Sequence, residues 1–269
     1  MILNGITLKY TPFRDSRGET GMSGKLYLAM APDGTRYLVK SNPMIVANEY
    51  VAHNLAKLIG VPTSDAVLIK DGDLVRVGIK YEEDFKLVSM DDFWGNEIQE
   101  SVDEVHYFDG SKGKWYKAPA IPPAKYPDDD PHLAELMAYM AFRTLIDLED
   151  NPQLAFARGH LISFDYAESF YLTDLTFNGI LRGGNLSHPV SLYASHLSLE
   201  SGFRMATDIL RRPRSDFLLE AYLAPVFAFQ EADFQLIFDD LDAVFPKMLS
   251  SFYRACFDIV KREYQKLEE

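Results

Sequence analysis

The first 90 residues carry the two-residue alternation of apolar and polar positions that is typical of β-strands. It predicts strands over residues 6–10, 25–30, 35–40, 66–70 and 74–81. Pro32-Asp33-Gly34 and Asp71-Gly72-Asp73 each separate two of these segments and predict tight turns. Residues 45–59 have the spacing of a helix that ends at Gly60, with Pro62 just beyond. The pattern indicates a small antiparallel sheet that carries one helix.

The chain changes character after residue 90. Residues 91–131 are weakly periodic and rich in proline towards their end, which is typical of a connection between lobes. A helix is predicted over 132–146, a short hairpin over 154–164, and mostly helices from about 190 to 269, with strong apolar faces at 217–229 and 243–260. We therefore expect an α+β fold with two lobes. Residues 1–90 form the β-rich N-lobe and residues 91–269 the mainly helical C-lobe, with a ligand site between them.

Composition excludes several classes of partner. The 269 residues include 27 Lys and Arg against 40 Asp and Glu, a formal net charge of −13. No basic stripe offsets this charge, so we expect no direct binding to nucleic acid or to anionic membranes. Cys256 stands alone, which excludes an internal disulfide. With no signal-peptide pattern at the N-terminus and no long apolar run, the expected setting is the reducing cytoplasm.

The turn before the second predicted strand reads Gly21-Met22-Ser23-Gly24-Lys25. Glycines allow backbone N–H groups to approach phosphate oxygens, and Lys25 adds positive charge. The spacing differs from a Walker A loop, and the turn does not open onto a helix. The alternative interpretation is an ordinary flexible hairpin loop.

A lysine and a glutamate follow in adjacent elements. Lys40 ends the strand predicted over 35–40, and Glu49 lies on the apolar stripe of the next helix. Burying a carboxylate is costly unless it is paired, and Lys40 is a suitable partner. The alternative is that Glu49 sits at the edge of the stripe, in water. A strand lysine followed by a helix glutamate is the protein-kinase arrangement, in which the lysine holds the α- and β-phosphates of ATP and the glutamate positions that lysine.

Carboxylates and an amide gather downstream, between the helix predicted over 132–146 and the end of the short hairpin. Phosphoryl transfer needs one carboxylate near the attacking hydroxyl, and an Asn and an Asp that bind Mg²⁺. Asp147, Asn151 and Asp165 could supply these groups. Such residues are also common in helix caps and solvated turns, but here they follow the lysine and glutamate in kinase order.

Four segments together resemble the HipA/CtkA-like bacterial kinases, which share a two-lobed architecture with protein kinases and phosphoinositide kinases. The segments read SGKLYLAMAPDGTRYLVK, NEYVAHNLAKLIGVP, VGIKYEEDFKLVSMDDF and FRTLIDLEDNPQLAFARGHLISFDYAESF. The second segment is the most specific, since it is similar to the family's helix motif E-[WY]-V-A-x-x-L-A-x-x-x-G-[LV]-P.

The resemblance implies ATP and Mg²⁺, or Mn²⁺, as cofactors. It places residues 81–90 in the adenine hinge. The residues that it implies for binding ATP, or for positioning the lysine, are Ser23, Gly24, Lys25, Lys40 and Glu49. The resemblance implies that Asp147 orients the acceptor hydroxyl and that Asn151 and Asp165 bind the metal.

The catalytic segment departs from the family pattern D-R-x-x-x-N. Leu148 follows Asp147 in place of Arg, and Asn151 comes four residues after Asp147 in place of five. Two alternatives therefore stay open: Asp150 as the base, and Gln153 as the amide that binds the metal. Misplacement of a catalytic group by about 1 Å can cost on the order of 100-fold in rate.

The resemblance implies a kinase that transfers the γ-phosphate of ATP to a Ser or Thr hydroxyl of a protein substrate. The first alternative is a catalytically degenerate pseudokinase that serves as a nucleotide-binding or interaction module. The second is a small-molecule or lipid kinase, because a fold does not fix the substrate. HipA-like toxins act beside a DNA-binding antitoxin, which implies an antitoxin-like partner for this chain.

Overall fold

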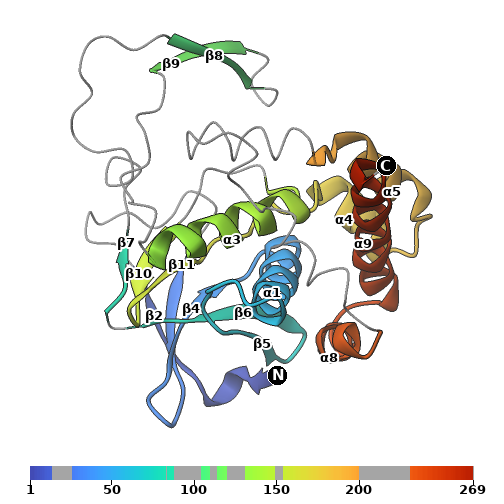
Figure 1. The fold of residues 1–269 in the computed structure, drawn as a ribbon. Coiled ribbons are helices and arrows are strands. Elements are labelled where there is room, and N and C mark those ends of the chain that lie inside the picture. Colours follow the sequence, from blue (N-terminus) through green and yellow to red (C-terminus); the bar gives the residue numbers. More distant parts are fainter. Residues whose placement is uncertain are drawn as a thin grey trace.

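The computed structural model describes residues 1–13, 26–82, 84–87, 104–109, 114–119, 131–148, 154–199 and 231–268. A six-stranded sheet, in the order β1-β5-β6-β4-β3-β2, forms its N-terminal part (Figure 1). The strands are β1 (Ile2–Asn4), β2 (Lys9–Pro12), β3 (Tyr27–Met30), β4 (Arg36–Lys40), β5 (Ala66–Asp71) and β6 (Leu74–Lys80).

The two hairpins predicted in this part of the chain are confirmed. β3 pairs with β4, and β5 pairs with β6, both antiparallel. The strand predicted over 6–10 is wrong at its start, because Gly5–Thr7 form a turn of 3₁₀ helix. The side chain of Asn4 accepts a hydrogen bond from the backbone N–H of Ile6, which favours that turn over a continuous strand. The pairing of β1 with β5 is parallel and was not predicted.

The predicted helix is α1 (Pro43–Leu58), which begins two residues earlier than expected. The Asn42 side chain caps it by accepting from Met44 N and Ile45 N, and Gly60 ends it at φ +79°. Every residue from Ile45 to His53 is buried. The reason is that α1 packs on β5 and β6 and also contacts α8. A helix covered on both sides has no solvent-facing polar stripe.

The later strands belong to two small sheets. β7 (Lys86–Leu87) pairs with β10 (Leu154–Ala157), which forms the predicted hairpin with β11 (His160–Ser163). Arg158 and Gly159 both have positive φ, as its two-residue turn requires. The segment expected to be a connection also contains a hairpin, β8 (Glu104–Asp109) with β9 (Lys114–Pro119), which stands apart from the other elements in Figure 1.

The described helices of the C-terminal part are α3 (Pro131–Leu145), α4 (Asp174–Leu181), α5 (Ser187–His196), α8 (Glu231–Asp242) and α9 (Lys247–Glu268). The helix predicted over 132–146 is confirmed as α3. The apolar helical face predicted over 243–260 begins later than expected, because α9 starts at Lys247, directly after Pro246. Residues 217–229 lie outside the described ranges. None of the helices in the described part has the length and apolar content needed to span a bilayer.

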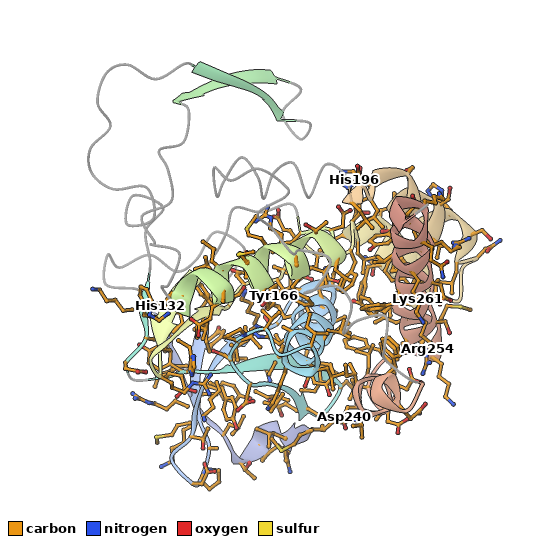
Figure 2. The ribbon with its side chains drawn as sticks, in the orientation of Figure 1. His132, Tyr166, His196, Asp240, Arg254 and Lys261 are labelled. Atoms are coloured by element: carbon orange, nitrogen blue, oxygen red, sulfur yellow. The ribbon has the colours of Figure 1, made fainter. Side chains whose placement is uncertain are left out.

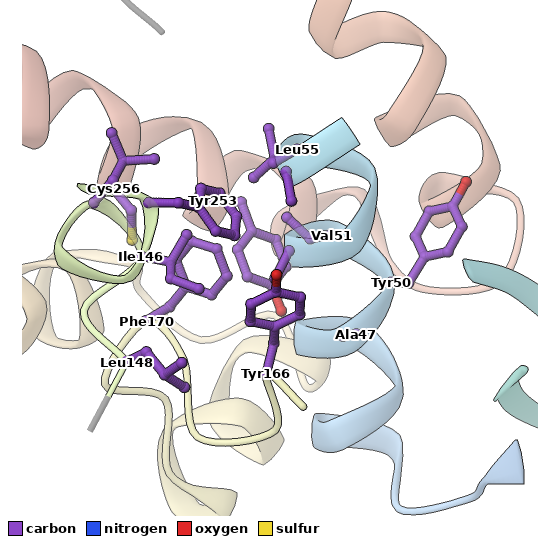
Figure 3. Packing of buried hydrophobic residues seen from close by; sticks show 14 of the residues in the cluster. Ala47, Tyr50, Val51, Leu55, Ile146, Leu148, Tyr166, Phe170, Tyr253 and Cys256 are labelled. Atoms are coloured by element: carbon purple, nitrogen blue, oxygen red, sulfur yellow. The ribbon is translucent and has the colours of Figure 1, made fainter. Parts of the chain in front are cut away.

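The main hydrophobic core is continuous from the sheet to the C-terminal helices. It contains Tyr50 and Leu55 of α1, Phe142 of α3 and Tyr253 of α9 (Figure 3). The fold class is therefore α+β, with a β-rich N-terminal part and a mainly helical C-terminal part, as the sequence predicts.

One buried amide ties three segments of this core together. Asn48 on α1 donates from Nδ2 to the carbonyl oxygens of Ala167 (2.9 Å) and Ser169 (3.0 Å), and its Oδ1 accepts from the Tyr253 hydroxyl (2.9 Å). Its side chain is fully buried. Because α1, the segment after β11 and α9 meet at this amide, it fixes the position of that segment against the helix.

Replacing Asn48 with Ala should therefore destabilise the chain strongly. The change leaves two buried carbonyls and one buried hydroxyl without this partner, and we expect a loss of about 3–5 kcal/mol in the free energy of unfolding. Tyr253→Phe is the matched control, since it removes one of the three hydrogen bonds and should cost about 1–2 kcal/mol. Urea denaturation measures both; equal losses in the two variants would contradict a joining role for Asn48.

Candidate active site

Three of the predicted residues meet at the end of β4, an interior strand of the six-stranded sheet. Lys40 is the last residue of β4, Glu49 lies in the middle of α1, and Asp165 follows β11 by two residues. The Lys40 ammonium forms an ion pair with Glu49 and contacts Asp165 Oδ1 at 2.9 Å. The sequence separation between Lys40 and Asp165 is 125 residues. We call Lys40, Glu49 and Asp165 the charged triad.

Burial makes this triad unusual. Glu49 is fully buried, which excludes the alternative placement at the edge of the stripe in water. Lys40 is buried as well, and the Asp165 side chain is 28% exposed. The triad thus holds two carboxylates and one ammonium, with the second carboxylate nearest to solvent.

The environment shifts the titration of all three groups. Burial disfavours the charge of Glu49, but the adjacent Lys40 and then His53 outweigh it and lower the pKa of Glu49 to about 2. For Lys40, burial is likewise outweighed by Glu49 and Asp165, and its pKa lies above its ordinary value. For Asp165, burial and the Glu49 carboxylate raise the pKa to about 6, although Lys40 opposes them.

A second set of contacts holds Glu49 in place. The backbone N–H of Tyr166 donates to Glu49 Oε2 at 3.2 Å, and His53 Nε2 lies 3.3 Å from the same oxygen. His53 Nδ1 is 2.7 Å from Thr63 Oγ1, and its ring packs edge-on against Tyr166. From the sequence, His53 is expected to be an ordinary helix residue, although its spacing of four residues from Glu49 on a buried helix was a usable signal.

Asp147 is the other predicted site residue that the structure describes. It follows the end of α3, has a left-handed backbone (φ +49°), and its Oδ2 lies 2.7 Å from Nδ1 of His196. Burial raises the pKa of Asp147, and the hydrogen bond and charge of His196 oppose that rise. His196, at the end of α5 (Figure 2), was not singled out from the sequence, because it is 49 residues from Asp147.

The remaining predicted site residues lie outside the described ranges. These are Ser23, Gly24 and Lys25 of the glycine-containing turn, and Asp150, Asn151 and Gln153 of the catalytic segment. Their roles stay predictions.

Part of the predicted adenine hinge, residues 81–90, is described. The Tyr81 and Phe85 rings stack with centroids 6.2 Å apart, and Phe85 meets Phe164 edge-on at 5.0 Å. Lys86 pairs with Phe156 in the β7–β10 ladder. An aromatic chain thus runs from the predicted hinge to the residue that precedes Asp165.

The chemistry of the triad fits a bound divalent cation beside a phosphate. A partly exposed carboxylate is the kind of oxygen ligand that Mg²⁺ prefers, and a lysine held between two carboxylates stays protonated for contact with anionic oxygens. Among the described residues, no group of three or more His, Cys, Asp and Glu side chains is placed to hold a metal ion. The role of Asp165 as a ligand of such a cation stays a prediction.

Opposite pKa shifts predict opposite stability effects for the two carboxylates. Asp165 has a folded pKa of about 6 against an ordinary 3.8, so its ionisation destabilises the fold above pH 6, and the penalty vanishes as the pH falls below 4. We expect Asp165→Asn to raise the free energy of unfolding by about 1–3 kcal/mol at pH 8 and to have little effect at pH 4.

Glu49→Gln is the matched variant. The folded pKa of Glu49 is about 2 against an ordinary 4.5, so its ionised form stabilises the fold above pH 4.5, and that contribution is lost as the pH falls towards 2. Removing the buried charge should cost about 3 kcal/mol or more at pH 8. Urea titrations without nucleotide or metal measure both variants, and destabilisation by Asp165→Asn at pH 8 would refute this account.

Comparisons with known proteins find likeness in structure. No family model and no curated protein matches the chain. The chain is similar to the Helicobacter pylori proinflammatory kinase CtkA, with 12% identity, a TM-score of 0.48, and coverage of 100% of this chain and 99% of that one. It is also similar to a chain of the Shewanella oneidensis toxin–antitoxin complex of HipA, HipB and operator DNA, with 10% identity and a TM-score of 0.40. That match covers 96% of this chain and 64% of the other.

Proposed function

We propose that the chain is an ATP-dependent phosphotransferase, a HipA-like kinase that phosphorylates Ser or Thr hydroxyls of a protein. The observation that carries this proposal is the charged triad: a strand lysine paired with a helix glutamate and in contact with the aspartate that follows a later strand. Kinase catalysis needs this lysine–glutamate pair and a metal-binding aspartate in place at the same time.

Stability alone does not account for the triad. A buried ion pair contributes little net stability, because desolvation offsets the attraction between the charges. Here a second carboxylate, Asp165, is added to a pair that is already neutral, and its raised pKa records that its charge is disfavoured. A group kept ionised at a cost to the fold is characteristic of a functional site.

Each member of the triad has a task in the proposed site. Lys40 would contact the α- and β-phosphates, Glu49 would keep Lys40 aimed at them, and Asp165 together with Asn151 would hold Mg²⁺ or Mn²⁺. The cation supplies charge neutralisation on the phosphates of ATP. Residues 1–90 serve as the nucleotide-binding N-lobe and residues 91–269 as the C-lobe, with Ser23, Gly24 and Lys25 over the phosphates.

Asp147 orients the acceptor in this proposal. The acceptor oxygen bonds to the γ-phosphorus as the bond between that phosphorus and the bridging oxygen breaks, and ADP leaves with the electron pair. The hydroxyl proton goes to the Asp147 carboxylate. The protein substrate and an antitoxin-like partner rest on the family resemblance.

Incubation with γ-labelled ATP and Mg²⁺ or Mn²⁺ tests the proposal. We expect label on the chain itself or on added protein substrates, recovered as phosphoserine or phosphothreonine. Lys40→Met and Asp165→Asn should each lower the rate by about 100-fold or more, because both act on charge that develops in the transition state. Lys261→Met is the matched control, since Lys261 is an exposed lysine on α9 and should leave the rate unchanged (Figure 2).

A thermal shift with ATP separates the alternatives. Nucleotide at about 100 times its Kd should stabilise the fold by about 2.7 kcal/mol. Stabilisation without transfer to any acceptor would favour the pseudokinase, and label on small molecules or lipids in place of protein would favour the second alternative. If ATP neither stabilises the fold nor donates phosphate to any acceptor, a nucleotide-dependent function is refuted.

A further inference from the structure

His196 contacts Asp147 from a separate element. Asp147 lies just beyond α3, and His196 is the last residue of α5; the two atoms in contact are Nδ1 of the imidazole and Oδ2 of the carboxylate, 2.7 Å apart. An ionised carboxylate can only accept, so the imidazole N–H is the donor. The His196 side chain is 38% exposed and that of Asp147 is 15% exposed. The contact thus lies at the surface end of a mostly buried carboxylate.

α5 is fixed to the end of α3 by a second contact. Tyr193, one turn before His196, is fully buried, and its hydroxyl donates to the backbone carbonyl of Leu145 at 3.0 Å. The residue after Asp147 is Leu148, which is buried in the main core. The local sequence therefore turns an apolar side chain inward at the position where the resembled pattern has Arg, and the donor to Asp147 comes from α5.

His196 is itself held by an aromatic ring. The Tyr171 ring stacks on it with centroids 3.9 Å apart and an interplanar angle of 12°. Phe170 and Tyr171 both have left-handed backbones (φ +63° and +48°), and Phe170 N donates to Ile146 O at 2.6 Å. Of the four non-glycine residues with positive φ in the described part, three belong to this cluster: Asp147, Phe170 and Tyr171. Strained backbone of this kind gathers at functional sites.

We propose that His196 is the positioning residue of Asp147, and that the pair identifies Asp147, rather than Asp150, as the carboxylate that orients the acceptor hydroxyl. This inference rests on the proposed kinase function. The imidazole fixes one carboxylate oxygen, which leaves the other to meet the acceptor. It also stabilises the ionised form that can take up the proton. The resembled pattern has an Arg, which can donate, where this chain has Leu148, which has no side-chain donor. His196 on α5 supplies a donor to Asp147 in its place.

Among the described residues, Tyr193 and Cys256 are titratable groups whose pKa values respond to Asp147, and both are neutral near pH 7. Tyr193 on α5 and Cys256 on α9 are both buried, and burial, followed by nearby groups that include Asp147, raises their pKa values well above the ordinary range. Tyr171 faces His196 from the segment before α4. Loss of His196 should therefore leave Asp147 with burial as the main influence on its pKa, so this pKa should rise.

Steady-state kinetics of two His196 variants test the role. His196→Leu removes the donor, and we expect kcat to fall by about 10- to 100-fold while KM for ATP stays within about twofold. The acidic limb of the kcat–pH profile should move to higher pH, because Asp147 then loses its proton less readily. His196→Asn keeps an amide donor near the Nδ1 position and should recover most of kcat. Circular dichroism and thermal melts establish that each variant is folded.

A double-mutant cycle assigns the partner. His196→Leu should have no further effect on kcat in an Asp147→Asn background, and its full effect in an Asp150→Asn background. Equal losses in His196→Leu and His196→Asn, an unmoved pH profile, or an undiminished effect in Asp147→Asn would overturn the inference. If His196→Leu does not fold, His196→Gln takes its place, because its amide reaches the Nε2 position and cannot replace Nδ1.

The outcomes also separate this inference from the function on which it rests. If the unaltered chain transfers no phosphate, the kinase proposal fails and the role of His196 fails with it. If the unaltered chain is active and His196→Leu has the same kcat and pH profile, the kinase proposal stands and the positioning role alone is refuted.

Discussion

The structure depends on burying the ion pair of Lys40 and Glu49, with Asp165 beside it. An ammonium in the interior is tolerated where opposite charges meet it, and Glu49 and Asp165 come from elements that the chain reaches at very different points. Lys40 lies at the end of β4, Glu49 points inward from α1, and Asp165 follows β11. The packing of α1 against both the sheet and α8 holds the buried carboxylate of this helix in position.

The sequence predicts the parts of this arrangement that depend on local pattern. Alternation and turn residues predict the β3–β4 and β5–β6 hairpins, and helical spacing predicts α1 and α3. The pairing of Lys40 with Glu49 could be predicted as well, since a carboxylate on an apolar stripe needs a cation and the preceding strand ends on one. The 3₁₀ turn at Gly5–Thr7 was missed because a single hydrogen bond, donated by Ile6 N to the Asn4 side chain, outweighs the alternation.

The groups that support the site were harder to predict, because their partners are distant in the sequence. Nothing in the local sequence distinguishes Asn48 from other polar residues, because its partners Ala167, Ser169 and Tyr253 are distant in the chain. His196 has no local feature that marks it, and its partner is fixed by how α5 packs against the end of α3. The spacing of apolar residues along a helix indicates which of its faces is buried. It does not indicate which residue of another helix lies opposite that face. Supporting contacts of this kind therefore emerge only from the tertiary structure.

One short segment links the carboxylates of Asp165 and Asp147. It begins at Asp165, whose Oδ1 contacts Lys40, and it is held at Ala167 and Ser169 by the Asn48 amide. It then turns through the left-handed residues Phe170 and Tyr171, where Phe170 N bonds the backbone just before Asp147 and Phe170 packs on Tyr253 (Figure 3). Tyr171 completes the connection by stacking on His196. Every step is a direct contact, so this segment connects Asp165 with the neighbourhood of Asp147. The strained backbone at Phe170 and Tyr171 is the turn that makes this connection short.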